Sequence, residues 1–252
     1  MSERKPVIRV LSLGAGVQST TLALMAARGE FEQPDCAVFA DTGWEPAAVY
    51  EHLGRLRRLL PFPVHIVRDG DIRDTIATGA YEPIPWHVGE RGSGGMGRRQ
   101  CTKQFKLTPI RRKIRDLLFG RCVQGGCEVW IGISRDEAHR MKPSRVGYIV
   151  NRWPLLELGM SRVDCLRKLE RWGIEAPRSA CCGCPFLSDA DWLARTTQPE
   201  WPATVAWSHR LAATGQFMHP ARTTIDQIDF SRWQDRGQAN LFGAECEGMC
   251  GT

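Results

Sequence analysis

Short apolar segments alternate with amphipathic ones through the first half of the chain, and this pattern limits the folds that it can adopt. Four segments are typical of buried strands: VIRVLSL (7–13), DCAVFADTG (35–43), PVHIVRD (63–69) and CEVWIGIS (127–134). Helices are predicted in the second half of residues 14–29 and over 45–60, 106–120 and 163–174. Strands and helices alternating at this spacing predict βαβ units, and therefore an α/β fold with a parallel sheet.

The second half of the chain differs in composition. From about residue 177 the periodicity weakens and tryptophan and cysteine accumulate. We therefore predict an α/β domain over residues 1–176 and a small helical lobe that contains cysteines over 177–252. The 252 residues, 42% of them hydrophobic, are sufficient for one large core with such a lobe. The glycine- and arginine-rich residues 79–100 are either a loop that covers a substrate or a passive insertion.

Composition also limits where in the cell the protein is expected and what kinds of partner it is expected to bind. No apolar run approaches the roughly 18–20 residues of a membrane helix, and the N-terminal residues MSERKPVIRV lack a secretory apolar region. Ten cysteines without such a signal favour a cytoplasmic protein that uses thiols for metal or redox chemistry. The net charge of +6, mostly from arginine, indicates either a solvated basic surface or an anionic partner such as a nucleotide or nucleic acid.

The glycine turn after the first predicted strand is a candidate phosphate site. A strand, then GAGVQST, then a helix lets backbone N–H groups and the helix N-terminus approach an anion. An ordinary strand-to-helix turn is the alternative. The turn lacks the lysine of a Walker loop, and Ser19 replaces the third glycine of a dinucleotide-binding turn.

Several motifs, in order along the chain, resemble one family. GAGVQS resembles the PP-loop S-G-G-x-D-S of the adenine-nucleotide α-hydrolase superfamily (PP-loop ATP pyrophosphatases), with departures at Gly14, Ala15 and Gln18. The chain as a whole is similar to the phosphoadenosine-phosphosulfate (PAPS) reductase-like family. The further segments that carry this resemblance are FADTG (39–43), RRQCTKQFKLTPI (98–110), GISRDEAHR (132–140), SACCGCPF (179–186) and ECEGMCG (245–251).

The resemblance implies a doubly wound, mostly parallel five-stranded sheet that binds ATP or a sulfated adenine nucleotide, with Mg²⁺ as a candidate companion ion. Loss of the aspartate at Gln18 removes one carboxylate that could position metal or phosphate, although the amide can still bond a phosphate oxygen. Lys106 and Arg140 are further candidate anion contacts. The residues carried over as the nucleotide site are Ser12, Gly14, Ala15, Gly16, Gln18, Ser19, Asp41, Thr42, Gly43, Lys103 and Arg135.

The cysteines form a second candidate site. Cys181 and Cys184 have C-x-x-C spacing and supply two of the roughly four ligands that a metal or cluster needs, whereas Cys182 points elsewhere. The segment around Cys101 resembles cluster-bearing adenylyl-sulfate (APS) reductases, in which a Cys-Cys pair joins the C-x-x-C in a [4Fe–4S] site. Here the pair has become Gln100-Cys101, so Cys101 supplies one ligand and Cys250 or Cys246 is the candidate fourth. A zinc ion held by Cys181, Cys184 and the two tail cysteines, or thiols without metal, are the alternatives. Cys122 and Cys127 could also bind metal, and Cys36 and Cys165 are predicted to be core residues.

The leading hypothesis is a PP-loop enzyme of sulfur chemistry that modifies a nucleic acid, such as DNA or tRNA, or a small molecule. An APS/PAPS reductase with Cys246 as the catalytic nucleophile is the first alternative. A non-catalytic nucleotide- or nucleic-acid-binding module with a structural zinc is the second. Candidate partners are a sulfur donor or reductant protein and a second copy of the chain, and no membrane is expected.

Two further predictions concern single side chains. His52, on a predicted helix, is expected at the surface. The tryptophans at positions 192, 201 and 207 have amphipathic spacing, which favours a place in the core over base stacking.

Overall fold

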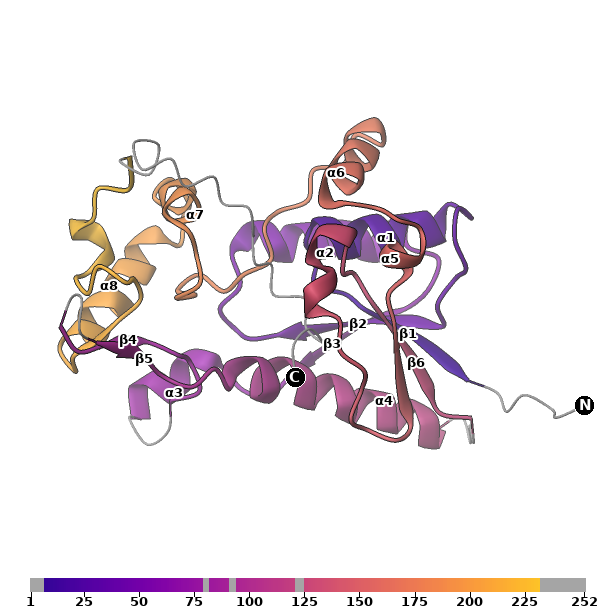
Figure 1. Ribbon diagram of the computed structural model, residues 1–252, viewed down its shortest axis with the longest axis horizontal. Helices are drawn as coiled ribbons and strands as arrows, with labels where there is room; N and C mark the ends of the chain where they lie inside the picture. The colour runs from indigo at the N-terminus through magenta and orange to yellow at the C-terminus, as the bar shows by residue number, and fades with distance from the viewer. Residues whose placement is uncertain (1–6, 79–81, 91–93, 121–124, 232–252) are drawn as a thin grey trace, which may run out of the picture.

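The computed structural model describes residues 7–78, 82–90, 94–120 and 125–231, and its centre is a five-stranded sheet (Figure 1). The strands are β1 (Ile8–Ser12), β2 (Cys36–Asp41), β3 (Val64–Arg68), β6 (Cys127–Ile131) and β7 (Ile149–Arg152). They lie in the order β3-β2-β1-β6-β7, and every neighbouring pair is parallel. The predicted α/β fold with a parallel five-stranded sheet is therefore confirmed.

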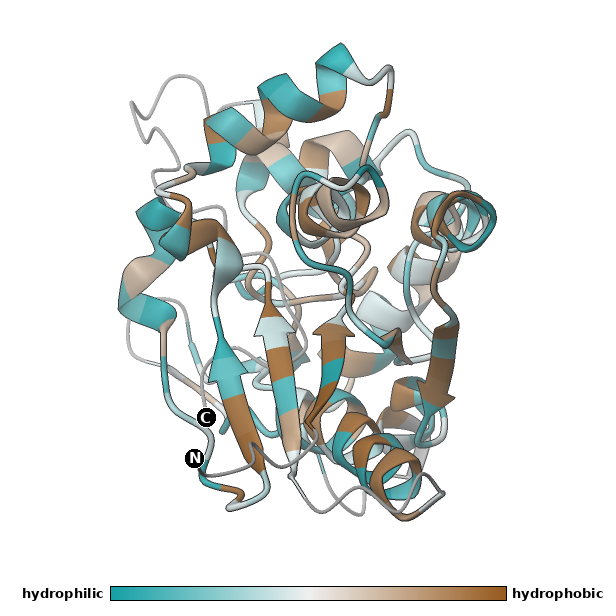
Figure 2. Cartoon of the chain, turned by 90° about the vertical axis from the view of Figure 1, so that its right-hand side faces the viewer, coloured by the Kyte–Doolittle hydropathy of each residue, from teal (hydrophilic) through white to brown (hydrophobic). Residues whose placement is uncertain are grey.

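Helices cover both faces of this sheet. Successive residues of a strand point to opposite faces, so that Leu11 packs into one core cluster and Val10 into another. The first face carries α1 (Val17–Ala27), α2 (Ala47–Leu59), α5 (Pro154–Glu157) and α6 (Arg162–Arg171), and the second carries α4 (Thr108–Gly120). Figure 2 shows hydrophobic residues concentrated in the central strands and hydrophilic ones on the outer helices. The fold is thus doubly wound.

The predictions of burial or exposure for three side chains have different outcomes. Cys36 and Cys165 are fully buried, as predicted. The prediction for His52 is wrong, because only 4% of the residue is exposed. Its Nε2 lies 2.9 Å from Oγ1 of Thr20 on α1, and this contact between two helices holds the imidazole inside. The periodicity of α2 places His52 on the same face as Val49 and Leu56, which the sequence pattern alone could have indicated.

The buried imidazole predicts a pH-dependent stability. Burial, with a smaller contribution from Arg55, lowers the pKa of His52 from 6.5 to about 4. Between these pH values, His52 therefore binds a proton in the unfolded chain and not in the folded chain. The free energy of unfolding decreases as the pH falls from 6.5 towards 4. We expect His52→Gln to flatten the dependence of the unfolding free energy on pH in this window, measured by urea denaturation. An unchanged slope would show that other groups cause the acid sensitivity.

A second body of structure packs at one end of the sheet, on the left of Figure 1. Its core contains Trp86, Phe105 and Trp192 together, so residues before and after position 176 share one cluster. Trp201 and Trp207 pack against the same cluster, so Trp192, Trp201 and Trp207 lie in or beside the core, as predicted. The division at residue 176 stays a prediction. The remaining elements are α3 (Ile72–Thr78), β4 (His87–Val88), β5 (Gly95–Met96), η1 (Thr102–Leu107), η2 (Arg135–Arg140), α7 (Asp189–Arg195), α8 (Trp201–Ala212), β8 (Gln216–Phe217) and η3 (Ile225–Gln227).

Short antiparallel pairings join the parts of this second body. Strand β4 pairs with β5 on one side and with β8 on the other, and β8 comes almost 130 residues later in the chain. Residues 82–90 and 94–105 are therefore joined to residues 177–231 by backbone hydrogen bonds as well as by packing. In the part of the chain that the structure describes, no helix has the length and apolar character needed to cross a membrane.

Candidate functional site

The strand order defines where a ligand would bind. The chain leaves β1 towards β2 on one side and leaves β6 towards β7 on the other, although β1 and β6 are neighbours. In open α/β sheets, ligands bind in the crevice outside the carboxyl ends of the strands at such a switch point. The segment after β1 is the glycine turn, and the segment after β6 begins at Gly132. Both lie at this crevice.

The glycine turn ends at an uncapped helix. Gly16 has an extended backbone, α1 begins at Val17, and no side chain caps the helix or places a carboxylate in its first turn. The first N–H groups of a helix have no intrahelical partner and carry the positive end of its dipole. The hydroxyl of Ser12, at the end of β1, is buried without a hydrogen-bond partner among the described residues. These donors suit an anion.

Two of the departures from the PP-loop pattern have visible consequences. Ala15 stands where the family has glycine, and it adopts a φ of 56° in the left-handed region although it is fully buried. Gln18 is fully buried, and its amide bonds Glu137 at 2.9 Å and Arg162 at 2.8 Å. The amide therefore joins α1 to η2 and α6. Its predicted bond to a phosphate oxygen stays a prediction, and it would have to compete with these contacts.

Close backbone packing also fixes the start of α1. A Cβ added to Gly132 would lie 2.9 Å from the backbone nitrogen of Ser19 and 3.1 Å from its Cα. Both are backbone atoms, so a larger residue must displace the helix rather than a flexible side chain. The absence of a side chain at position 132 therefore keeps the first turn of α1 beside β6.

Substitution of Gly132 tests whether this close packing fixes the start of α1. We expect Gly132→Ala to destabilise the fold by about 1–3 kcal/mol through overpacking, and to weaken ATP binding because the helix start moves. Gly54→Ala on α2 is the matched control, since its Cβ meets only an Arg58 nitrogen at 4.0 Å. The control should stabilise the helix by about 0.5–1 kcal/mol. Thermal unfolding and calorimetric titration with ATP measure both effects, and equal behaviour of the two variants would contradict the argument.

The turn after β2 is held by its own aspartate. Asp41 accepts hydrogen bonds from the Gly43 N–H at 2.8 Å and from the Tyr50 hydroxyl at 2.7 Å. Burial raises the pKa of Tyr50, and the bond to Asp41 raises it further, so the phenol stays a donor. Gly43 has a φ of +77°, and its carbonyl accepts a bond from Arg73. The predicted Asp41–Thr42–Gly43 turn is thus a rigid wall at the carboxyl end of β2.

The cysteine segment SACCGCPF connects these two loops. The hydroxyl of Ser179 donates to the carbonyl of Gly14 in the glycine turn. The N–H of Cys182 donates to the carbonyl of Trp44 at 2.8 Å, and Cys181 Sγ lies 3.4 Å from Thr42 Oγ1. Gly183 packs against the Trp44 ring, where a Cβ would come within 2.3 Å. The segment therefore lies against both the glycine turn and the turn after β2.

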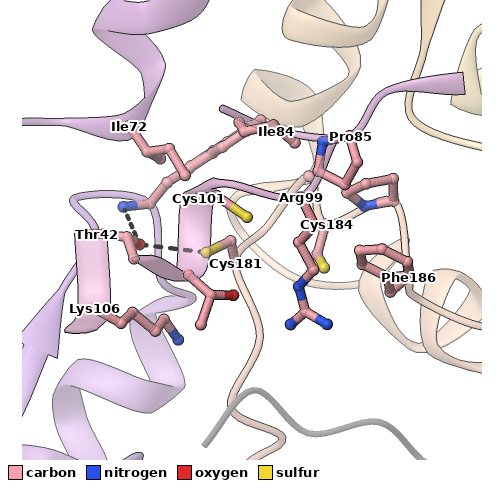
Figure 3. A pocket seen from close by; sticks show the side chains of 14 residues that line it. Thr42, Ile72, Ile84, Pro85, Arg99, Cys101, Lys106, Cys181, Cys184 and Phe186 are labelled. Carbon is pink, nitrogen blue, oxygen red and sulfur yellow. Dashed lines mark hydrogen bonds between the residues drawn. The ribbon is translucent and has the colours of Figure 1, made fainter. Parts of the chain in front are cut away.

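Three cysteines from distant parts of the chain line one pocket. Cys101, which immediately precedes η1, faces the same space as Cys181 and Cys184 (Figure 3). A π-helical segment such as η1 is rare and frequent at functional sites. Its Lys106 lines the same pocket. Three of the four predicted metal ligands thus line one pocket, and Cys101 comes from some eighty residues before Cys181 in the chain.

A buried ion pair supports one wall of this pocket. The Nζ of Lys106 lies 3.6 Å from Oε1 of Glu45, and the two side chains are only 7% and 1% exposed. The same Glu45 oxygen accepts a 2.9 Å bond from Thr42 and lies 3.6 Å from Cys181 Sγ. Its other oxygen is buried without a partner in the described ranges. Burial, and after it the nearby Glu45 charge, raise the pKa of Cys181.

The metal prediction is only partly addressed by this geometry. Within the described residues, no group of three or more His, Cys, Asp or Glu side chains is close enough to hold a metal ion. Cys122 and the tail cysteines Cys246 and Cys250 lie outside the described residues, so the predicted fourth ligand and nucleophile stay predictions. Cys127 is a core residue, and burial raises its pKa to about 12. The donor chemistry of the three pocket thiols nevertheless suits a soft metal.

Other predicted contacts lie further out, and several important residues were not predicted. Lys103 and Arg135 are exposed, and no contact of their side chains with the glycine turn is recorded among the described residues. The sequence reasoning did not single out four contributors: Glu45, Glu137, Gly132 and Ser179. Each stands within or beside a quoted motif, so attention to the polar neighbours of those motifs was the available signal.

Comparisons with known proteins add a limited finding. No family model matches the sequence, and no curated protein matches it. Among solved structures, the chain is similar to phosphoadenylyl-sulfate (PAPS) reductase from Candida auris in a phosphate complex. The two share 13% sequence identity and superpose with a TM-score of 0.47, over 68% of this chain and 75% of that chain. The fold assignment rests on the strand order, and any functional assignment rests on the site.

Proposed function

We propose that this protein is an enzyme of sulfur chemistry that binds an adenine nucleotide at Gly14–Ser19 and an iron–sulfur cluster in the cysteine pocket. The observation that carries the proposal is the position of one short segment. Ser179 donates a hydrogen bond to the glycine turn. Cys181 and Cys184, which follow it by two and five residues, line the pocket. An enzyme that activates an acceptor with ATP and then adds sulfur needs both sites within reach of one substrate.

The nucleotide half of the proposal is supported by the donors at the crevice. The uncapped first turn of α1 and the buried Ser12 hydroxyl would bind phosphate oxygens, and Asp41–Gly43 would lie beside the nucleotide. Adenine is taken from the resemblance to PP-loop enzymes, with Mg²⁺ as the usual counter-ion of ATP. In the proposed reaction an acceptor oxygen attacks the α-phosphorus. A new P–O bond forms, the bond to the β-phosphate breaks, and pyrophosphate leaves with its electron pair.

The cluster half of the proposal is supported by the donor set. Cys101, Cys181 and Cys184 would hold a [4Fe–4S] cluster, with Cys250 or Cys246 as the fourth ligand. Held by four protein thiolates, such a cluster would organise the site and shape its electrostatics. Held by three, it would supply an iron that remains open for sulfur chemistry. The chain itself contributes the Lys106 ammonium beside the thiols, which offsets their negative charge when they are deprotonated. A zinc ion in the same pocket is the competing occupant.

Two measurements on protein purified without oxygen test the proposal. We expect a brown protein with iron bound and little zinc, and pyrophosphate release from ATP when the correct acceptor is present. A colourless protein with one zinc ion and no ATP binding would refute it. Turnover of APS or PAPS without ATP would assign the reductase reaction instead, with Cys246 as the residue to test.

A further inference from the structure

An exposed aromatic ring stands at the mouth of the cysteine pocket. Phe186 follows Cys184 and Pro185, is 39% exposed and belongs to none of the hydrophobic core clusters of the described residues. The guanidinium carbon of Arg99 lies 4.8 Å from the centre of its ring. Both side chains line the pocket, and Figure 3 shows them beside Cys184. Core packing does not account for a ring held in this position with one part open to solvent.

The charged side chains that line the pocket are basic. Among the described residues these are Arg99 and Lys106, and none is acidic, while the Lys106 ammonium is paired with Glu45 behind the wall. Arg98 and Lys103, on either side of Arg99 and Cys101 in the chain, are exposed, and neither has an acidic partner among the described residues. The remaining walls include the apolar Ile72, Ile84 and Pro85. Such an entrance suits a ligand that is flat and apolar in one part and anionic in another.

We propose that Phe186 and Arg99 form a stacking platform for one base of a single-stranded nucleic acid, whose phosphates contact Arg98 and Lys103. The inference deepens the proposed function and rests on it, because the strand would be the acceptor presented to the cysteine pocket. Aromatic rings and guanidinium planes stack on bases that are not paired, whereas a duplex hides both faces of each base. The platform therefore selects a single strand.

Binding of a labelled single strand of about 16 nucleotides, followed by fluorescence anisotropy, tests the platform. We expect Phe186→Ala to weaken binding about 5- to 150-fold, the range for loss of one stacked base. Phe186→Tyr keeps the ring and should bind like the parent chain, whereas Phe186→Leu keeps apolar bulk and should behave like the alanine variant. Arg99→Lys should also weaken binding, because it keeps the charge and loses the planar group.

The salt dependence tests the phosphate contacts separately. We expect Arg98→Ala and Lys103→Ala each to reduce the slope of log affinity against log salt by about 0.7, the value for one phosphate contact on a single strand. Arg58→Ala is the matched control. Arg58 is exposed in the last turn of α2, which leads back to the amino end of β3 and thus to the opposite edge of the sheet. Its removal takes away the same charge and should leave the slope unchanged.

The outcomes separate this inference from the proposed function, because ATP binding and iron content are measured on the same preparations. Intact ATP and iron binding without any effect of Phe186→Ala on the strand would overturn the platform alone. Strand binding that depends on Phe186, in a protein without iron or ATP binding, would overturn the proposed function alone. Weaker ATP binding by Phe186→Ala would assign the ring to the nucleotide, and equally tight binding of a duplex would also overturn the platform.

Discussion

Cys181→Ala and Cys184→Ala are expected to lose nearly all bound iron, whereas Cys182→Ala should retain the parent's content. The first two thiols line the pocket with Cys101, and Cys182 instead packs in the core cluster with Trp44. Each of these two substitutions removes a thiolate that the proposed cluster would use and so weakens its attachment. Iron and zinc per chain, measured after purification without oxygen, give the result directly.

The three variants are well matched, since each removes one sulfur atom from the same four-residue stretch. Cys182→Ala is expected to cost the most stability, because it leaves a small space in a packed core. Thermal unfolding of the three proteins therefore separates loss of metal from loss of fold. Equal iron in all three variants, or loss of iron only in Cys182→Ala, would contradict the assignment of ligands.

Lys106→Met is expected to destabilise the fold by about 3–5 kcal/mol, the cost of leaving one charge of a buried pair without its partner. Among the described residues, the remaining Glu45 carboxylate would keep its contacts with Thr42 and Cys181. Removing both charges, as in the double variant Lys106→Met with Glu45→Gln, should recover much of that loss. Urea denaturation of the two single variants and the double variant measures the coupling between the side chains.

A surface pair supplies the control for this cycle. Arg112 and Asp69 form an ion pair at 2.8 Å, with side chains 56% and 30% exposed. Arg112→Met should cost no more than about 1 kcal/mol, because water screens an exposed pair. If Lys106→Met costs equally little, water reaches the pocket wall and the buried pair does not organise it.

The sequence predicted the fold well where the local pattern and the tertiary environment agree. The inner strands β1, β2 and β6 are apolar runs bounded by turns, because a parallel sheet covered by helices buries both faces of its central strands. Strand β7 was not identified from its residues. It has four residues, and Val150 is 66% exposed, so this edge strand lacks the continuous apolar run of the inner strands. The pairing of β4 with β8 was equally invisible, since two-residue strands carry no periodicity.

The sequence predicted where the backbone turns of the site lie better than it predicted the hydrogen bonds between its polar side chains. The glycine turn and the Asp41 turn follow strands directly, so their place at the sheet edge follows from topology. The partners of Gln18 do not, because Glu137 and Arg162 reach it from segments more than a hundred residues away. Glu45 reads as an ordinary acidic residue at a helix start. Only the fold places it beside Lys106 and Cys181.

The wide spacing of the pocket thiols has a consequence for how the protein is made. Cys101 leaves the ribosome about 80 residues before Cys181, which at about 5–20 residues per second is a delay of about 4–16 s. During that time Cys101 has no neighbouring thiol from this pocket, and strand β6, which completes the centre of the sheet, is synthesised only within the same interval. A metal delivered to the nascent chain would thus meet only one of the three pocket thiols. We therefore expect metal to enter the pocket only after synthesis of the chain is complete.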